Sequence, residues 1–322
     1  MKYVTLGKSE LRVSRIAFGT WQLGGDWGST DSDAAVSAIR RAADSGVTFF
    51  DTAQAYGFGA SERLLGEALY GRSRNDFFIA TKGGLRQSGA GVTRDAGADS
   101  IRAGVEQSLR ALSTDYIDLY HVHWPDPHTP FDDTADVLAK LVADGKVLHV
   151  GVSNFDVAQM DAFSATLPVE TLQPPYHLFH REIEHAILPY THENNIGVLV
   201  YGPLAHGLLG GNLDLTTRFA ADDWRAQSRD FRGANYEHNL KRINELSEFA
   251  TKELGVTVAQ LAIAWTLANP SVHVAIVGSR NPDHVQETLS AVELELDEQS
   301  LSRIEDIMWD VIPVAGPSPE MV

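Results

Sequence analysis

The sequence of 322 residues contains no cysteine. Disulfides, thiolate metal sites and cysteine nucleophiles are therefore excluded, and a reducing compartment such as the cytoplasm suits the composition. Long apolar runs are also lacking. The opening segment MKYVTLGKSELRVSRI has no run of signal-peptide length, and no later segment approaches the roughly 18 apolar residues of a membrane span. We expect a cytoplasmic protein without a membrane-spanning segment.

Basic residues are scarce, with 26 Lys and Arg against 43 Asp and Glu, so that the formal net charge is −17. Nucleic acids and anionic membrane surfaces are bound through clustered Lys and Arg, and this charge balance argues against both. The hydrophobic fraction of 43% is sufficient for a sizeable core. We therefore expect a globular protein with neither nucleic acid nor membrane as a partner.

Eight short runs rich in β-branched and aromatic residues recur along the chain and predict strands. They lie at 16–19, 48–51, 77–82, 116–123, 147–154, 170–173, 198–201 and 273–278. Amphipathic stretches between them predict helices, for example at 33–46, 98–112, 134–145 and 239–255. Strands that alternate with helices indicate right-handed crossovers and a parallel sheet. Eight repeats indicate a closed (β/α)8 barrel of the α/β class, the TIM barrel.

The alternative architecture is an open doubly wound sheet, which usually has a glycine-rich turn after its first strand. Here FGTWQLGG (18–25) lacks the G-x-G-x-x-G pattern and GFGASE (57–62) has no third glycine, so the barrel is favoured. Without an internal repeat or a Pro-rich linker, we expect one domain over residues 1–322. Two additions are expected: an N-terminal β-hairpin around Gly7 and Lys8, and a long loop after strand 7, residues 205–238, of the kind that forms functional lids.

In such a barrel the chemistry lies at the C-terminal ends of the strands. Asp51 ends the second predicted strand and Lys82 the third, so the two side chains are expected to be neighbours. Tyr56 lies five residues past Asp51, in a loop that can fold back towards Lys82. A tyrosine has a pKa of about 10, and a cation within a few ångströms lowers it by roughly 1 to 3 units. Lys82 would thereby make Tyr56 a usable proton donor.

The segment HVHWPDPH, residues 121–128, poses the alternative of a metal site. His121 and His123 lie two apart on a strand and point to the same side, as in the H-x-H of some metal-dependent hydrolases. Further ligands would have to come from other strand ends, but VGVSN and AIVGSR offer neither His nor Asp. Three histidines follow strand six after two prolines: His177, His180 and His185. We expect no metal, and interpret His123 as a neutral group that orients a substrate carbonyl beside Tyr56.

Several separated motifs resemble those of the aldo-keto reductase family, and the match runs from LGKSELRVSRIAFGTWQLGG almost to the C-terminus. FFDTAQAYGFGASERLLGEAL (49–69) is similar to the D-T-A-x-x-Y-G segment of that family, IATKGG (79–84) to its lysine strand and DLYHVHWPD (118–126) to its histidine strand. VGVSNF (150–155) and the Y-x-P-L-x-x-G-L-L run at 201–209 agree as well. The resemblance implies a barrel enzyme that reduces an aldehyde or ketone to the alcohol with a nicotinamide cofactor. It also implies a catalytic tetrad: Asp51, Tyr56, Lys82 and His123.

The resemblance also assigns residues to the cofactor. Ser153, Asn154 and Gln173 would hold the nicotinamide carboxamide, and Tyr201 would stack on the nicotinamide ring. GSRNPDHVQETL (278–289) resembles the segment that grips the adenosine 2′-phosphate, where the family uses a hydroxyl and an arginine, so NADPH is favoured over NADH. The further contacts that it implies are Gly202, Leu204, Gly207, Leu209, Gly278, Ser279, Arg280, His284, Glu287 and Thr288.

The sequence departs from the family pattern at a few of these positions. Gly202 stands where a serine is frequent and Asn212 where a lysine is frequent, so the pyrophosphate is expected to rely more on backbone donors. His284 stands where the family often has Gln or Arg, and Thr288 stands where it often has Asn. His177 stands where an asparagine is common after P-Y. The contacts to adenine and phosphate are therefore less closely matched than the tetrad.

Aromatic residues near the expected active face predict the substrate pocket. Trp21, Phe58 and Trp124, with Trp27 as a weaker candidate, suit a hydrophobic carbonyl compound. In the segment 205–238, three further aromatic residues either close over the bound molecules or form a small core of their own: Phe219, Trp224 and Phe231.

Two other functions are compatible with parts of the sequence. One is a low-turnover NADPH-binding redox sensor or partner subunit, as in the channel-associated members of the family. The intact tetrad, with His123 in place, speaks against it. The other is the metal-dependent hydrolase suggested by HVHWPDPH.

Overall fold

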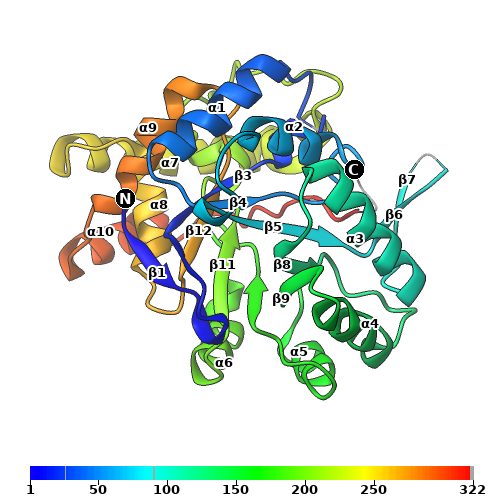
Figure 1. Cartoon of the computed structure of the whole chain (residues 1–322). Coiled ribbons are helices and arrows are strands. Elements are labelled where there is room, and N and C mark those ends of the chain that lie inside the picture. The colour runs from blue at the N-terminus through cyan, green and yellow to red at the C-terminus, as the bar shows by residue number, and fades with distance from the viewer. Residues whose placement is uncertain (26, 90, 320–322) are drawn as a thin grey trace.

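The computed structural model describes residues 1–25, 27–89 and 91–319. Eight parallel strands close into a barrel (Figure 1), which confirms the predicted fold. The hydrogen-bonded order is β3, β4, β5, β8, β9, β10, β11, β12 and back to β3. The strands are β3 Ile16–Gly19, β4 Phe49–Asp51, β5 Phe78–Gly83, β8 Ile117–Val122, β9 Val147–Ser153, β10 Thr171–Gln173, β11 Gly197–Tyr201 and β12 Val274–Val277.

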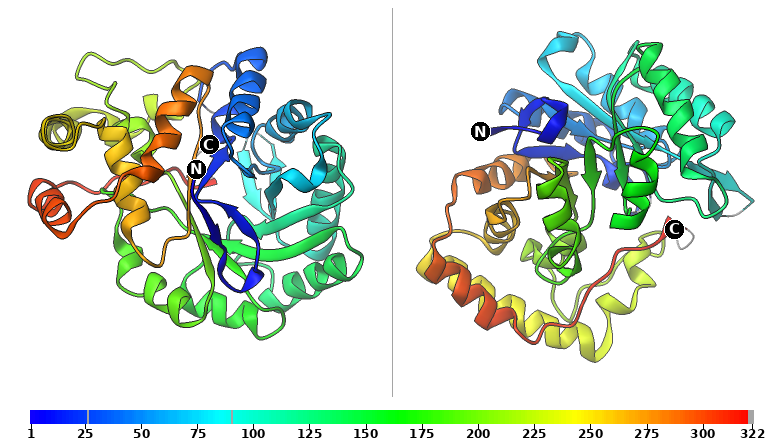
Figure 2. Two further views of the ribbon diagram at one scale, coloured as in Figure 1. Left: turned by 60° about the vertical axis from the view of Figure 1, so that its left-hand side comes forward. Right: turned by 90° about the horizontal axis from the view of Figure 1, so that it is seen from below.

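Helices surround the barrel (Figure 2, left). Several begin where the sequence offers a capping side chain: Asp31 accepts from the backbone N–H groups of Asp33 and Ala34, and Thr257 forms a capping box with Gln260. The helices are α1 Ser32–Asp44, α2 Ala60–Leu69, α3 Ala98–Leu112, α4 Phe131–Ala143, α5 Val157–Ser164, α6 Ile187–Glu193, α7 Gly233–Glu253, α8 Val258–Ala268, α9 Pro282–Ser290 and α10 Glu298–Met308.

Helix α1 illustrates why these segments are helical. Its apolar residues recur at helical spacing and are buried against the barrel and its neighbours: Ala35, Val36, Ala38, Ile39 and Ala42. Its polar side chains face outwards, as in a helix that covers a barrel. Within the described parts of the chain, no helix is both long and apolar enough to cross a membrane.

The expected N-terminal hairpin is present. Strands β1 (Tyr3–Thr5) and β2 (Arg12–Ser14) pair antiparallel around Gly7. Gly7 has a φ of +54°, and a Cβ on it would lie 2.3 Å from the backbone nitrogen of Gly197, so only glycine permits this close approach to β11. Leu6 is fully buried in the cluster inside the barrel, and the hairpin thus closes the end where the strands begin.

Residues along each strand alternate between the inside and the outside of the barrel. Ala80 and Leu119 belong to the cluster that fills the inside, whereas Tyr120 and Val122 pack outwards against helices. By the same alternation Lys82 on β5 points inwards, above Ala80. Hydrophobic side chains therefore fill much of the lower barrel, and the buried polar residues Lys82, His121 and His123 lie towards the C-terminal ends of β5 and β8.

The structure departs from the prediction in three segments. The helix predicted from residue 239 begins at Gly233, and residues 205–232 contain the short 3-10 helices η5 Ala205–Gly210, η6 Trp224–Ala226 and η7 Arg229–Phe231. A hairpin that was not predicted, β6 (Leu85–Ser88) with β7 (Gly91–Arg94), follows β5. After α10 the chain runs past α7 and back towards the barrel (Figure 2, right).

Candidate functional site

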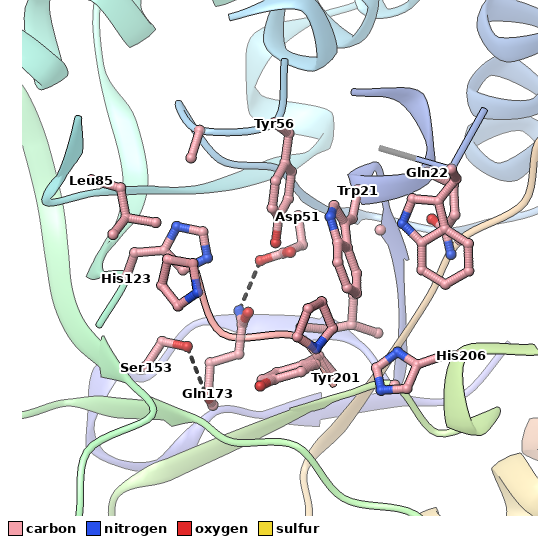
Figure 3. Close-up of a pocket in the computed structure, with 18 of the residues that line it drawn as sticks. Trp21, Gln22, Asp51, Tyr56, Leu85, His123, Ser153, Gln173, Tyr201 and His206 are labelled. Atoms are coloured by element: carbon pink, nitrogen blue, oxygen red, sulfur yellow. Dashed lines mark hydrogen bonds between the residues drawn. The ribbon is translucent and has the colours of Figure 1, made fainter. Parts of the chain in front are cut away.

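A cavity of about 360 Å³ opens at the C-terminal ends of the barrel strands. It is lined by residues from all eight strand ends or the loops after them, as expected for a barrel of this type. Figure 3 shows the side chains of Tyr56, Asp51 and His123 gathered on one side of it, with Tyr201 and His206 lying further along the wall.

Lys82 is the centre of a buried charged group beneath this cavity. Its Nζ donates to Asp51 Oδ1 at 2.7 Å, to the carbonyl oxygen of Thr52 at 2.7 Å and to the hydroxyl of Tyr56 at 3.2 Å. The side chains of Lys82 and Asp51 are 1% and 4% exposed, so this ion pair lies almost outside the reach of solvent. Gln173 completes the shell of Asp51, because its Nε2 donates to Oδ2 at 2.8 Å.

Burial and the negative charge of Asp51 shift the pKa of Lys82 in opposite directions. Burial lowers the pKa of Lys82, and the charge of Asp51 together with its hydrogen bond raises it again. A protonated Lys82 at 3.2 Å from the Tyr56 hydroxyl stabilises the phenolate form of that tyrosine. The geometry expected from the sequence for Asp51, Tyr56 and Lys82 is therefore present.

His123 follows β8 directly and lies beside Tyr56, with the two rings edge to face and their centroids 5.7 Å apart. Burial and the charge of Lys82 hold the pKa of His123 well below its usual range, so the imidazole is neutral at physiological pH. His121 lies one layer below, where its Nε2 is 3.0 Å from the hydroxyl oxygen of Thr171. The two histidines thus point to the same side of the strand, and His123 is the one that reaches the cavity.

Amide and hydroxyl groups form a connected network on the opposite wall. Asn154 Nδ2 donates to the carbonyl oxygen of His123 at 3.0 Å and to Ser153 Oγ at 3.1 Å, while its Oδ1 accepts from the Tyr201 hydroxyl at 2.9 Å. Ser153 Oγ donates to the carbonyl oxygen of Gln173 at 2.8 Å. These four side chains line the cavity together, as the sequence indicated. They are polar, rigidly held and able to contact an amide.

The loop after β11 forms another part of the wall. Gly202, Leu204 and Gly207 line the cavity, whereas Leu209 is fully buried in the hydrophobic core. Ala205, His206 and Gly207 all have positive φ angles, of 46°, 57° and 95°. Such a run is uncommon for non-glycine residues and bends the chain sharply, and the N–H groups of Ala205 and Gly207 donate to the carbonyl oxygens of Gly202 and Leu204 within the turn.

The segment after β12 lies at the edge of the same cavity. Gly278 lines it, and the side chain of Asn281 caps α9 by accepting from the N–H of Asp283. Ser279 Oγ donates to the carbonyl oxygen of Asn281, while Arg280 Nη1 donates to that of Trp27 at 2.9 Å. The remaining residues expected here lie on α9 with exposed or half-buried side chains: His284, Glu287 and Thr288.

The expected aromatic wall is present, and the structure extends it. Trp21, Trp27, Phe58 and Trp124 all line the cavity, and the guanidinium of Arg94 lies 5.0 Å from the ring centre of Trp124. Residues not expected from the sequence complete the lining: Gln22, Leu85, Gln87, Val92, His206, Pro317 and Pro319. Leu85, Gln87 and Val92 come from the unpredicted hairpin and Pro317 and Pro319 from the segment after α10, whereas Gln22 and His206 lie in the loops after β3 and β11. Their sequences carry no strand or helix periodicity that would have placed them.

The loop 211–232 packs over this wall through its aromatic residues. Trp224 stacks on Trp21 with ring centroids 6.3 Å apart, and Phe231 lies edge to face with Trp224 and Phe219. These residues form the small core considered as one alternative, and Trp224 also contacts Trp21 of the cavity wall; closure of the segment over bound molecules stays a prediction. Arg225 lies between the rings of Trp27 and Phe219 and is paired with Asp223.

Three of the remaining histidines pack against one another, but among the described residues they do not form a metal-binding arrangement. His177 and His180 pack with ring centroids 5.8 Å apart, and His177 also contacts His206. Asp126 organises the turn after β8, where it accepts from the backbone of Ala96 and His128. Among the residues that the structure describes, no group of three or more His, Asp or Glu side chains is arranged to hold a metal ion.

Comparisons with known proteins agree with this architecture. Residues 15–308 match the family model described as Aldo/keto reductase family. The chain is 40% identical to aldo-keto reductase YhdN of Bacillus subtilis over 315 residues, covering 97% of this chain and 95% of the relative.

Solved structures give the same result. The chain resembles the glycerol dehydrogenase AKR11B4 from Gluconobacter oxydans, with a TM-score of 0.88, 38% identity and 98% of each chain covered. It also resembles an aldo/keto reductase from Klebsiella pneumoniae solved in complex with NADP and acetate, with a TM-score of 0.76, 30% identity and coverage of 100% of this chain and 99% of the other. The chain belongs to the aldo/keto reductase family of oxidoreductases.

Proposed function

We propose that the protein is an NADPH-dependent reductase of aldehydes or ketones. The observation that carries this proposal is the buried arrangement of Lys82 between Asp51 and the hydroxyl of Tyr56, with the neutral His123 beside them. In this proposal Tyr56 is the proton donor and His123 the carbonyl-binding group, and both line one cavity together with aromatic residues. The metal-dependent hydrolase finds no support in the donor sets of the described residues.

The residues around the cavity fit a nicotinamide dinucleotide. Ser153, Asn154 and Gln173 offer amide and hydroxyl groups that match a carboxamide, and the ring of Tyr201 offers a flat face beside them. Gly202, Gly207 and Gly278 line the cavity beside these groups, and glycine lets a bound phosphate approach the backbone closely. The bound cofactor supplies a hydride to the carbonyl carbon. Arg280, exposed beside Ser279, supports the preference for the 2′-phosphate of NADPH.

Tyr56 is the proposed acid of the reduction. Its hydroxyl donates a proton to the substrate oxygen, and Lys82 at 3.2 Å stabilises the phenolate that this transfer leaves behind. Asp51 keeps Lys82 charged in a buried position and is itself held by Gln173. These side chains therefore act as one unit in proton transfer.

His123 is the proposed orienting group. Because burial and Lys82 lower its pKa, it is neutral and can donate one N–H to the substrate oxygen without competing as an acid with Tyr56. Its backbone carbonyl is fixed by Asn154, which couples the carbonyl-binding side of the cavity to the proposed carboxamide site. The two reactants are thereby held in a defined mutual orientation.

The walls of the cavity indicate the class of substrate. Trp21, Phe58 and Trp124 present aromatic surface, and Leu85 and Val92 from the β6–β7 hairpin add aliphatic surface. Gln87 is the polar side chain that this hairpin contributes. A compact, largely apolar aldehyde or ketone with few additional hydroxyl groups suits this lining.

A panel of carbonyl compounds tests the proposal. The purified protein is incubated with NADPH and with aliphatic, aromatic and polyhydroxylated aldehydes and ketones, and oxidation of NADPH is followed by absorbance. We expect saturable turnover, with higher kcat/KM for apolar aldehydes than for polyhydroxylated ones. Tight NADPH binding without turnover on any member of the panel would contradict the proposed enzyme and favour a cofactor-binding subunit.

A further inference from the structure

A second buried carboxyl group lies behind the charged cluster, on the outer side of the barrel wall. Glu62 belongs to α2 and is 0% exposed. Glutamate is almost never fully buried unless it is paired, because the loss of water around its charge is costly. Nothing in the proposed reaction uses this residue, so its burial requires another explanation.

Glu62 is attached to the strand that carries Lys82. Its Oε1 accepts a hydrogen bond from Thr81 Oγ1 at 2.7 Å, and Thr81 directly precedes Lys82 on β5. Because side chains alternate along a strand, Thr81 points outwards to α2 while Lys82 points into the barrel. The other oxygen, Oε2, is buried and has no hydrogen-bond partner among the described residues. The carboxyl group is therefore only partly satisfied by neutral donors.

Charged groups lie near Glu62 on the outer side of β5, where Arg40, Arg63, Glu67 and Arg110 line a cavity together with it. Burial raises the pKa of Glu62, and the hydroxyl groups of Ser108 and Thr81, followed by the charges of Lys82 and Arg63, oppose this rise. Tyr120 on β8 faces Glu62 as well; its pKa is raised by burial and then by the charge of Glu62.

Lys82 in turn faces Asp51 and Tyr56 inside the barrel. His121 and His123, whose pKa values it helps to lower, face it from β8. Burial lowers the pKa of Lys82, and Asp51 and then Glu62 raise it. Lys82 thus lies between two carboxyl groups, one on each side of β5.

We propose that Glu62 is a positioning residue for the reduction. It fixes β5 through Thr81, and its negative charge acts in addition to that of Asp51 to keep Lys82 protonated. This role rests on the proposed function, in which a charged Lys82 supports proton donation by Tyr56. Glu62 does not touch substrate or cofactor. It acts on Lys82 only through the position of β5 and through the electrostatic effect of its charge.

The test is the pH dependence of carbonyl reduction in a Glu62→Gln variant, which keeps the shape and the acceptor oxygen but removes the charge. Turnover falls at high pH when the Tyr56 and Lys82 pair loses its first proton, whichever of the two gives it up. Removal of a nearby negative charge favours this loss. The basic limb of the kcat profile is therefore expected to move to lower pH by about one unit, given the strength of charge interactions at buried sites.

The chain offers a matched control and a conservative rescue. Glu67→Gln removes the same charge from the exposed side of α2 and is expected to leave the basic limb in place. Glu62→Asp retains the charge and is expected to restore the limb towards the wild-type position. Thr81→Val keeps the side-chain volume but removes the hydroxyl that holds Glu62, so the limb is expected to move in the same direction as in Glu62→Gln.

Circular dichroism and NADPH affinity, both expected to be unchanged, show that each variant is folded. A basic limb in Glu62→Gln that coincides with wild type, or an equal shift in Glu67→Gln, would overturn the inference while leaving the proposed reduction intact. If Glu62→Gln does not fold, the Thr81→Val profile decides in the same way. Absence of reduction by the wild-type protein would instead refute the proposed function.

Discussion

Replacement of Lys82 by methionine removes one half of the buried ion pair and leaves the other half in place. Asp51, whose side chain is 4% exposed, then keeps Gln173 as a hydrogen-bond partner and loses the cation with which it is paired inside the barrel. The carbonyl oxygen of Thr52 also loses the donor that contacts it at 2.7 Å. Methionine fills most of the volume of the lysine side chain, so the change is mainly one of charge and hydrogen bonding.

The magnitude follows from the distance and the burial. Two unit charges 2.7 Å apart attract each other by roughly 6 kcal/mol if the effective dielectric constant is about 20. Much of this attraction offsets the cost of removing both groups from water. Loss of one partner of a buried pair costs about 3–5 kcal/mol, because the other charge remains buried and unpaired. We expect the free energy of unfolding of Lys82→Met to fall by this amount.

Urea unfolding of wild type, Lys82→Met, Asp51→Asn and the double variant measures this effect. Because the double variant carries no unpaired charge, it is expected to be more stable than Lys82→Met alone. A double variant whose loss equals the sum of the two single losses to within about 0.5 kcal/mol would refute the reasoning, since independent sites are additive and directly paired groups are not.

Two further predictions concern acid stability and cofactor choice. Burial lowers the pKa of His121 and of His206 to about 3, below the value of about 6.5 in an unfolded chain. The unfolded state then binds more protons than the folded state as the pH falls below about 6.5. We expect each of these histidines to lower the free energy of unfolding by about 1.4 kcal/mol at pH 5.5 relative to pH 7.5. Urea unfolding of wild type and of His121→Gln at the two pH values measures this effect. A variant whose pH dependence equals that of wild type would contradict this assignment. Arg280→Met is expected to raise the Kd of NADPH by about 10- to 100-fold, corresponding to loss of a hydrogen bond from a charged group, and to leave the Kd of NADH within about two-fold, both measured by fluorescence quenching. Equal weakening of the two cofactors would place Arg280 away from the 2′-phosphate.

The barrel could be predicted because its signal is repeated along the chain. Each strand is a short run of β-branched and aromatic residues, and each helix such as α1 has apolar residues on one face, so eight consistent repeats outweigh errors at single elements. The position of Asp51 and Lys82 at strand ends then followed from the fold class. Their 2.7 Å contact is the consequence of adjacent parallel strands with a shared C-terminal edge.

The parts that could not be predicted lie in segments without periodicity. The β6–β7 hairpin carries Leu85, Gln87 and Val92 into the cavity, but its strands are short, mostly exposed or half-buried and close to glycines, so they resemble a loop in sequence. Pro317 and Pro319 reach the same cavity from a segment placed by distant contacts, such as that of Val314 with the carbonyl oxygen of Phe179. Contacts of this kind depend on the whole fold and leave no local pattern.

Leu209 and Glu62 show two different limits of motif comparison. Leu209 belongs to the G-L-L run expected to contact the cofactor, and because its side chain is fully buried in the core, such a contact would have to come from its backbone. Glu62 lies within segment 49–69, which resembles a family motif, but the sequence did not indicate a role for it. Its link to Lys82 passes through Thr81 and the barrel wall. Only the three-dimensional structure shows that the carboxyl group of Glu62 and the amino group of Lys82 lie on opposite sides of β5.

The most direct test of the account is the turnover of Tyr56→Phe with NADPH and the best aldehyde of the panel. Phenylalanine keeps the ring that packs against Trp21 and His123 but lacks the hydroxyl next to Lys82. We predict that kcat falls by about 10²- to 10⁴-fold, the usual contribution of a positioned general acid, while the Kd of NADPH stays within about three-fold of wild type. Turnover by Tyr56→Phe close to the wild-type rate would contradict the central claim that Tyr56 protonates the substrate.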